Sequence, residues 1–108
     1  MKIQGGFKMN GIDPKLILNA LALLSQNSDL LNKFVQSLDM PNIPLPTLGG
    51  HVFWTTLAEY NGLKLQTNMI THHARILDKD DVRIAWGSVE AMDRALTRIV
   101  DFANRYNS

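Results

Sequence analysis

Residues 72–88 hold two histidines, two arginines and three aspartates, a dense group of side chains that could do chemistry. Histidines can ligate a metal or transfer protons near neutral pH. However, His72 and His73 are adjacent on an expected strand, so their side chains leave opposite faces and do not readily share one ion. His51 could approach one of them, yet no metal-ligand spacing is visible. We therefore expect no metal site, and a small enzyme or metal-binding protein using His51, His72 or His73 is the last of three alternatives.

The aspartates of this stretch are candidates for a calcium loop. A loop of the EF-hand type needs a glycine at its sixth position and a glutamate at its twelfth, and counted from Asp78 these places hold Arg83 and Val89. The sequence therefore does not match this type of site. Because aspartates in turns commonly accept hydrogen bonds from nearby backbone N–H groups, we expect Asp78, Asp80 and Asp81 to build a turn.

Cationic side chains form the second candidate site. A period of two in hydropathy predicts strands over 63–69, 73–77 and 82–87. The polar face of these strands would carry four side chains that could hold phosphates: Lys64, His73, Arg75 and Arg83. The same period directs Trp86 to the opposite, apolar face, so the cluster lacks an aromatic side chain that could stack a base. Nucleic-acid binding through this face is therefore the alternative function.

Local signals place the helices around these strands. Asp13 and Pro14 begin a first helix that runs to about Asn27, and a second helix begins near Ser28. Since only the short segment "SQNS" connects them, the two helices predict a helical hairpin. Ser88 is expected to be the N-cap of a last helix.

The segment between the hairpin and the strands has two alternative assignments. Residues 40–50 contain three prolines and a double glycine, which predicts an extended connector lying across the core. In residues 51–62, Asn61-Gly62 is a strong hairpin signal, which would make the preceding residues a strand. Against it, four apolar side chains follow helical spacing: Phe53, Trp54, Leu57 and Ala58. We favour a short helix that ends at Gly62.

These elements predict one α+β domain over residues 12–108, preceded by a flexible leader over residues 1–11. The domain contains an N-terminal helical hairpin, a short third helix, a three-stranded antiparallel meander and a C-terminal helix packed on one face of the sheet. At 108 residues, with 45% hydrophobic and 19% charged residues and a net charge of +1, the chain has an ordinary globular composition.

Composition and motifs exclude several classes of function. The chain has no cysteine, which rules out disulfides, thiolate catalysis and cysteine-ligated metals. It carries no phosphate-loop motif and no nucleophile-elbow motif, so we expect no cofactor and no catalytic residues. No apolar run is long enough for a membrane span and no secretory signal is visible, so we expect a soluble cytoplasmic protein without membrane contact.

The first helix carries the main functional prediction. Its sequence "LILNALALL" is apolar on nearly every side, which is more than one helix partner and one sheet can cover. A second copy of the chain would cover the surplus, so we predict a homodimer with an isologous interface. The predicted interface residues are Leu16, Ile17, Leu18, Leu21, Leu23 and Leu24. The expected function is a small non-catalytic protein–protein interaction or regulatory module, with an unidentified protein partner as a further option.

Overall fold

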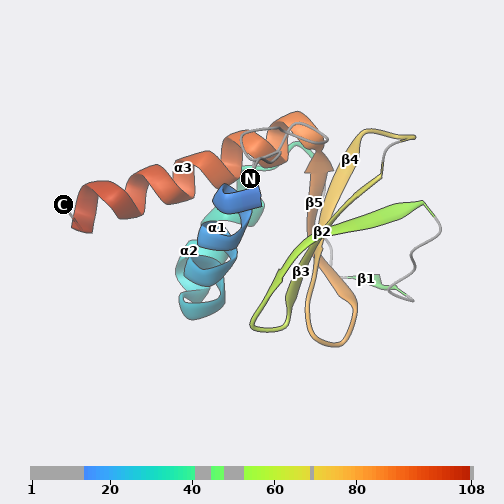
Figure 1. Ribbon diagram of the computed structural model, residues 1–108, viewed down its shortest axis with the longest axis horizontal. Helices are drawn as coiled ribbons and strands as arrows, with labels where there is room; N and C mark the ends of the chain where they lie inside the picture. Colours follow the sequence, from blue (N-terminus) through green and yellow to red (C-terminus); the bar gives the residue numbers. More distant parts are fainter. Residues whose placement is uncertain (1–13, 41–44, 48–52, 69, 108) are drawn as a thin grey trace.

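The computed structural model (Figure 1) describes residues 14–40, 45–47, 53–68 and 70–107. These residues form three helices, α1 (Pro14–Gln26), α2 (Ser28–Gln36) and α3 (Val89–Asn107). They also form five strands, β1 (Leu45–Pro46), β2 (Trp54–Tyr60), β3 (Leu63–Asn68), β4 (His73–Leu77) and β5 (Val82–Ser88). The predicted α+β class is therefore confirmed, although the described strands outnumber the three expected. The predicted leader, residues 1–11, lies outside the described residues.

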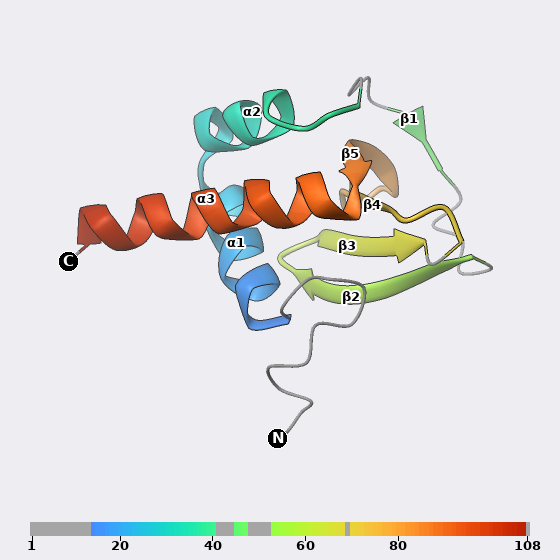
Figure 2. The same cartoon turned by 90° about the horizontal axis from the view of Figure 1, so that it is seen from above.

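The strands make one antiparallel sheet in the order β1-β5-β4-β3-β2. The helices all lie on one face of it, as Figures 1 and 2 show. Apolar side chains alternate towards the helices along β3 and β4, and they form the core with α1 and α3; they include Leu65, Ala74 and Ile76. The opposite face of the sheet, called the far face below, carries the polar side chains of the same strands.

The segment expected to be a short helix is the strand β2, so this prediction is wrong. Asn61 and Gly62 both have positive φ, 55° and 89°, as a tight two-residue turn between antiparallel strands requires. The register of β2 against β3 shifts between Thr56 and Ala58, which marks a β-bulge. Leu57 and Ala58 both pack against the core. Two consecutive apolar residues on one side of a bulged strand imitate the spacing of a helix.

The predicted helical hairpin is also corrected. A single residue, Asn27, separates α1 from α2, and its backbone is extended at φ −146° and ψ 104°. The Asn27 side chain accepts a hydrogen bond from the backbone N–H of Leu30 at 3.1 Å, so it is the N-cap of α2. One residue is shorter than the loop of a helical hairpin, and the chain turns a corner instead of folding back (Figure 2).

The connector that was expected to cross the core contributes an edge strand. Leu45 and Pro46 of β1 pair with β5 and are exposed. Thr47 fastens the connector to the turn after β4, because its backbone N–H and its hydroxyl both donate to the carbonyl oxygen of Asp81, at 3.0 and 2.6 Å. The remainder of the connector, residues 41–44 and 48–52, lies outside the described residues.

The start of α3 is capped as predicted. The hydroxyl of Ser88 accepts a hydrogen bond from the backbone N–H of Ala91 at 3.1 Å. Asp39, after the end of α2, accepts two hydrogen bonds from Ser88 and so holds the helices together at this corner. Gly87 permits this approach, because a Cβ atom there would lie 2.6 Å from the Oδ1 atom of Asp39.

Candidate functional site

The faces of β5 differ from the alternation that the sequence predicts. Ile76 of β4 pairs with Ala85, and the next residue, Leu77, pairs with Arg83, so one residue of β5 is inserted between them. This β-bulge reverses which side the following residues face. Trp86 pairs with Arg75 and therefore lies on the far face, so its predicted position on the apolar face is wrong.

Trp86 is joined on the far face by the side chains of Arg83 and His73. The guanidinium of Arg83 lies over its indole ring, with the Cζ atom 4.4 Å from the ring centroid. The ring of His73 is tilted by 45° against the same indole at a centroid distance of 5.3 Å. A second arginine is stacked in the same way, because the Cζ atom of Arg75 lies 4.1 Å from the ring centroid of Trp54. We call the group formed by Trp54, His73, Arg75, Arg83 and Trp86 the Arg–Trp face.

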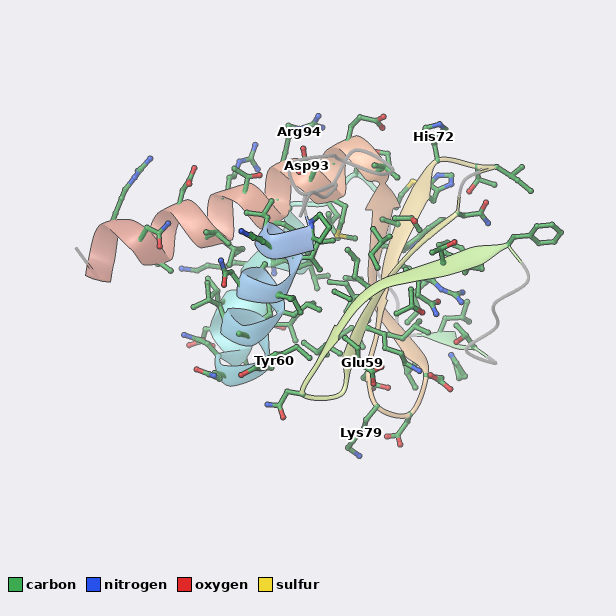
Figure 3. All side chains as sticks on the ribbon, viewed as in Figure 1. Glu59, Tyr60, His72, Lys79, Asp93 and Arg94 are labelled. Atoms are coloured by element: carbon green, nitrogen blue, oxygen red, sulfur yellow. The ribbon has the colours of Figure 1, made fainter. Side chains whose placement is uncertain are left out.

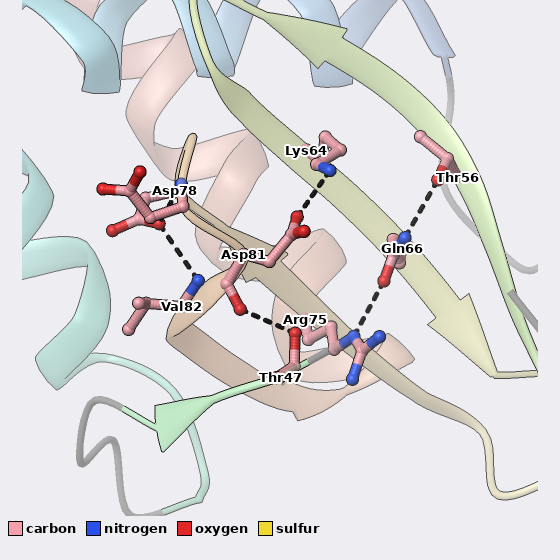
Figure 4. Close-up of polar contacts among 9 residues, drawn as sticks. Thr47, Thr56, Lys64, Gln66, Arg75, Asp78, Asp81 and Val82 are labelled. Atoms are coloured by element: carbon pink, nitrogen blue, oxygen red, sulfur yellow. Dashed lines mark hydrogen bonds and ion pairs between the residues drawn. The ribbon is translucent and has the colours of Figure 1, made fainter. Parts of the chain in front are cut away.

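Arg75 is held in place by a hydrogen-bonded row across three strands. Its Nε atom donates to the Oε1 atom of Gln66 at 2.8 Å, and the Nε2 atom of Gln66 donates to the hydroxyl of Thr56 at 3.0 Å (Figure 4). Gln66 is fully buried and Arg75 is only 8% exposed. The far face is therefore more ordered at this point than a solvated sheet surface.

The electrostatics of this arrangement are unusual for buried guanidinium groups. Burial lowers the pKa of Arg75, and repulsion by the charge of Arg83 lowers this pKa further, whereas the nearby carboxylate of Asp81 acts in the opposite direction. Among the described residues, neither arginine forms an ion pair with a carboxylate. The Nε atom of Arg83 is buried and has no hydrogen-bond partner within the described part of the chain. A partly dehydrated pair of cations that no carboxylate pairs directly is unfavourable by itself and attracts an anion.

Lys64 differs from the other predicted phosphate contacts. Its Nζ atom lies 2.6 Å from the Oδ1 atom of Asp81, an ion pair that neutralises its charge (Figure 4). The structure therefore brings together Arg75, Arg83 and His73, whereas Lys64 is paired with a turn aspartate. We leave Lys64 out of the Arg–Trp face.

The other two histidines do not join this group. His72 is exposed in the turn between β3 and β4, where its φ is 60°, at the opposite end of the sheet from Lys79 (Figure 3). His51 lies outside the described residues. Within the described ranges, no group of three or more metal-ligating side chains gathers in a way that could hold an ion.

The aspartates between β4 and β5 build a turn, as predicted. The Oδ1 atom of Asp78 accepts hydrogen bonds from the backbone N–H groups of Asp80 and Val82, at 2.8 and 3.0 Å. Asp81 occupies the left-handed region with φ 60°, a conformation that aspartate tolerates better than most residues. The carboxylates thus support the turn that positions Arg83.

The predicted interface residues of α1 are largely covered by the chain itself. Ile17, Leu21 and Leu24 are buried in the core, and Leu16 and Leu23 are partly buried against it. Leu18 is 45% exposed. The helix packs against α2, α3, β2 and β3. Two helices and two strands therefore cover most of its apolar side chains, whereas the sequence interpretation assumed only one helix and one sheet as neighbours. The single chain therefore covers five of these six side chains fully or in part and leaves Leu18 exposed, and the homodimer itself stays a prediction.

Sequence reasoning missed Trp54, Gln66 and Thr56 as parts of the site. The signal that could have found Trp54 was the Asn61-Gly62 hairpin turn, which places β2 beside β3. The bulge that turns Trp86 towards the arginines leaves no comparable local signal.

Within the described parts of the chain, no helix combines the length and the hydropathy that a membrane crossing needs. Comparisons with protein-family models, with curated proteins and with solved structures found no match to this chain.

Proposed function

We propose that this chain is a small non-catalytic binding module that holds a phosphate-bearing ligand, a single-stranded nucleic acid or a nucleotide, on the Arg–Trp face. The observation that carries the proposal is the pair of stacked guanidinium groups of Arg75 and Arg83, neither of which forms an ion pair with a carboxylate among the described residues. A phosphate would supply the missing negative charge. The planar donors of arginine match phosphate oxygens in pairs.

The aromatic side chains favour a ligand that also carries a base. Trp54 and Trp86 are half-buried, and each has an arginine stacked on its ring. Bases of single strands stack on aromatic rings and on guanidinium planes, whereas double-stranded DNA is contacted mainly along its backbone and grooves. From the sequence we expected no aromatic residue beside the positive charges, but Trp54 and Trp86 lie next to Arg75 and Arg83.

Two probes that share phosphate and base test this proposal: adenosine monophosphate and a single-stranded RNA of about twelve nucleotides. Quenching of tryptophan fluorescence reports the first and anisotropy of a labelled strand reports the second, both at about 50 mM salt. We expect Arg83→Gln to weaken binding at least about tenfold, because a lost guanidinium–phosphate contact contributes more than 1 kcal/mol.

Lys79→Gln is the matched control, since Lys79 is a cation whose side chain is 79% exposed in the turn that precedes Arg83. This variant should bind as the wild type does. Binding of both probes assigns a nucleotide site, and binding of the RNA alone assigns a polymer site. If the folded wild-type protein binds neither probe, the proposal fails.

A homodimer through α1 is our second proposal. Leu18 favours it, because this leucine is 45% exposed on a helix whose neighbouring leucines are covered. Light scattering should then give the mass of a dimer for the wild type and the mass of a monomer for Leu18→Glu. A folded wild-type monomer at high concentration would rule out this contact.

A further inference from the structure

A groove between α2 and α3 lies apart from the Arg–Trp face, on the helical side of the molecule. It has a volume of about 250 Å³. Phe34, Ala95 and Ile99 form its floor, and all three are buried. Leu30 of α2 and Phe102 of α3 form its sides.

The sides of the groove leave apolar surface uncovered. Phe102 of α3 is 50% exposed. The C-terminal part of α3 extends beyond the other two helices (Figures 1 and 2). Leu30 on the opposite side is half-buried. A continuous apolar floor with open sides, between two helices that lie side by side, has the shape that accepts a third helix.

The charge around the groove has one sign. Lys33 of α2 and Arg98 of α3 line it from opposite sides, and both are exposed. Within the described ranges, no acidic residue lines it and neither cation forms an ion pair. A helix that binds in this groove is therefore favoured if it carries carboxylates along both of its own sides, next to these two cations.

We infer that the α2–α3 groove docks an acidic amphipathic helix of a partner protein, with an apolar stripe on the groove floor and glutamates or aspartates beside Lys33 and Arg98. Opposite charges across such a contact set orientation and partner choice. The inference is independent of the Arg–Trp face, so either proposal can fail while the other holds.

Charge also argues against two other occupants. A second copy placed symmetrically on the groove would bring its own Lys33 and Arg98 against the same cations, which repels. Residues 1–13 carry two lysines, Lys2 and Lys8, against one acidic residue, Asp13, so the chain's own amino-terminal segment has a net positive charge, which is the wrong sign.

A designed peptide pair tests the inference on the full chain. The first peptide has about eighteen residues, leucines at i, i+3, i+4 and i+7 spacing and glutamates on its flanks. The second is identical except that lysines replace the glutamates. Fluorescence anisotropy should show binding of the acidic peptide and at least about tenfold weaker binding of the basic one.

Charge reversal of the groove should reverse this preference. The double variant Lys33→Glu/Arg98→Glu is expected to lose the acidic peptide and gain the basic one, and Phe102→Ala should weaken the acidic peptide about fivefold or more through lost apolar contact. Lys79→Glu, an equivalent reversal in the distant β4–β5 turn, should change nothing. Circular dichroism confirms that each variant is folded.

Three results would overturn the inference. The first is equal binding of both peptides by the wild type, or no binding at all. The second is a wild-type dimer that light scattering shows to dissociate in the charge-reversed variant, since the occupant would then be a second copy. The third is a synthetic peptide of residues 1–13 that binds as tightly as the acidic peptide.

Discussion

The guanidinium of Arg75 on β4 is stacked on the indole of Trp54 on β2, with a Cζ-to-centroid distance of 4.1 Å across the intervening strand β3. This contact ties the edge strand to the centre of the sheet through side chains as well as backbone hydrogen bonds. It also places a cation at a buried position on the far face, where an apolar side chain would need no hydrogen-bond or charge partner. The chain therefore keeps a buried positive charge at a position that stability alone does not require.

Trp54→Ala should lower the free energy of unfolding by about 2 kcal/mol, since a partly dehydrated cation–π contact and some apolar burial are lost. Trp54→Phe retains an aromatic ring over Arg75 and should recover part of this loss. Urea denaturation followed by circular dichroism measures both variants. A loss below about 0.5 kcal/mol for the alanine variant would show that the stacking contributes little.

The double variant Gln66→Leu/Arg75→Met should separate stability from binding. It replaces a buried cation and its amide partner by apolar side chains, so the free energy of unfolding should stay within about 1 kcal/mol of the wild type or rise. Gln66 is changed together with Arg75 because its Oε1 atom would otherwise be buried without a donor. RNA binding should disappear in the same variant. A folded variant that still binds RNA would remove Arg75 from the site.

Gly62→Ala tests the turn that the sequence interpretation placed at the end of a helix. At φ 89° a Cβ atom is strained, and it would lie 3.2 Å from the Cβ atom of Lys79. We expect a loss of about 1–2 kcal/mol in the free energy of unfolding. The control is Gly62→Ala with Lys79→Gly, which removes the steric contact and should recover only part of the loss. Unchanged stability in the single variant would contradict the turn.

A pair of alanine variants in α1 tests how the chain covers its own helix. Leu21 is fully buried, so Leu21→Ala should cost about 2–5 kcal/mol through lost burial and a cavity. Leu18→Ala should change the stability of a monomer by less than about 0.5 kcal/mol. Thermal and urea denaturation at two protein concentrations compare them. Similar losses for both variants would mean that Leu18 is covered in solution, as the homodimer proposal requires.

The contact between Asp39 and Ser88 should make stability depend on pH. The backbone N–H and then the hydroxyl of Ser88 lower the pKa of Asp39 below 3.8, because both donate to the carboxylate. A lowered pKa in the folded state means that this stabilisation is complete above the unfolded pKa. It is lost as pH falls through the folded pKa.

The variant Asp39→Asn should therefore be less stable than the wild type at neutral pH, and this difference should shrink below about pH 4. Ser88→Ala keeps the backbone donor, so it should retain part of the pH dependence while losing about 1 kcal/mol of helix capping. Urea denaturation at a series of pH values measures both. A difference between Asp39→Asn and wild type that does not vary with pH would exclude this role of the carboxylate.

The features that could be predicted from the sequence depend on neighbours along the chain. The strands β3 and β4, the turn aspartate Asp78 and the N-cap Ser88 are set by residues within a few positions, and the structure confirms them. His73 and the two arginines Arg75 and Arg83 were also found this way, since a regular strand sends alternate residues to one face.

The features that only the tertiary structure decided depend on contacts between distant segments. Each of two β-bulges, one in β2 and one in β5, inserts one residue and so changes the side of the sheet that Leu57 and Trp86 face. An inserted residue in a strand has no periodic signature in the sequence. The cover of α1 comes from α2, α3 and the sheet together, which no periodicity in α1 can report. Sequence alone therefore determined the residue types of the candidate site, and packing across the sheet determined that Trp54 and Trp86 join Arg75 and Arg83 on one face.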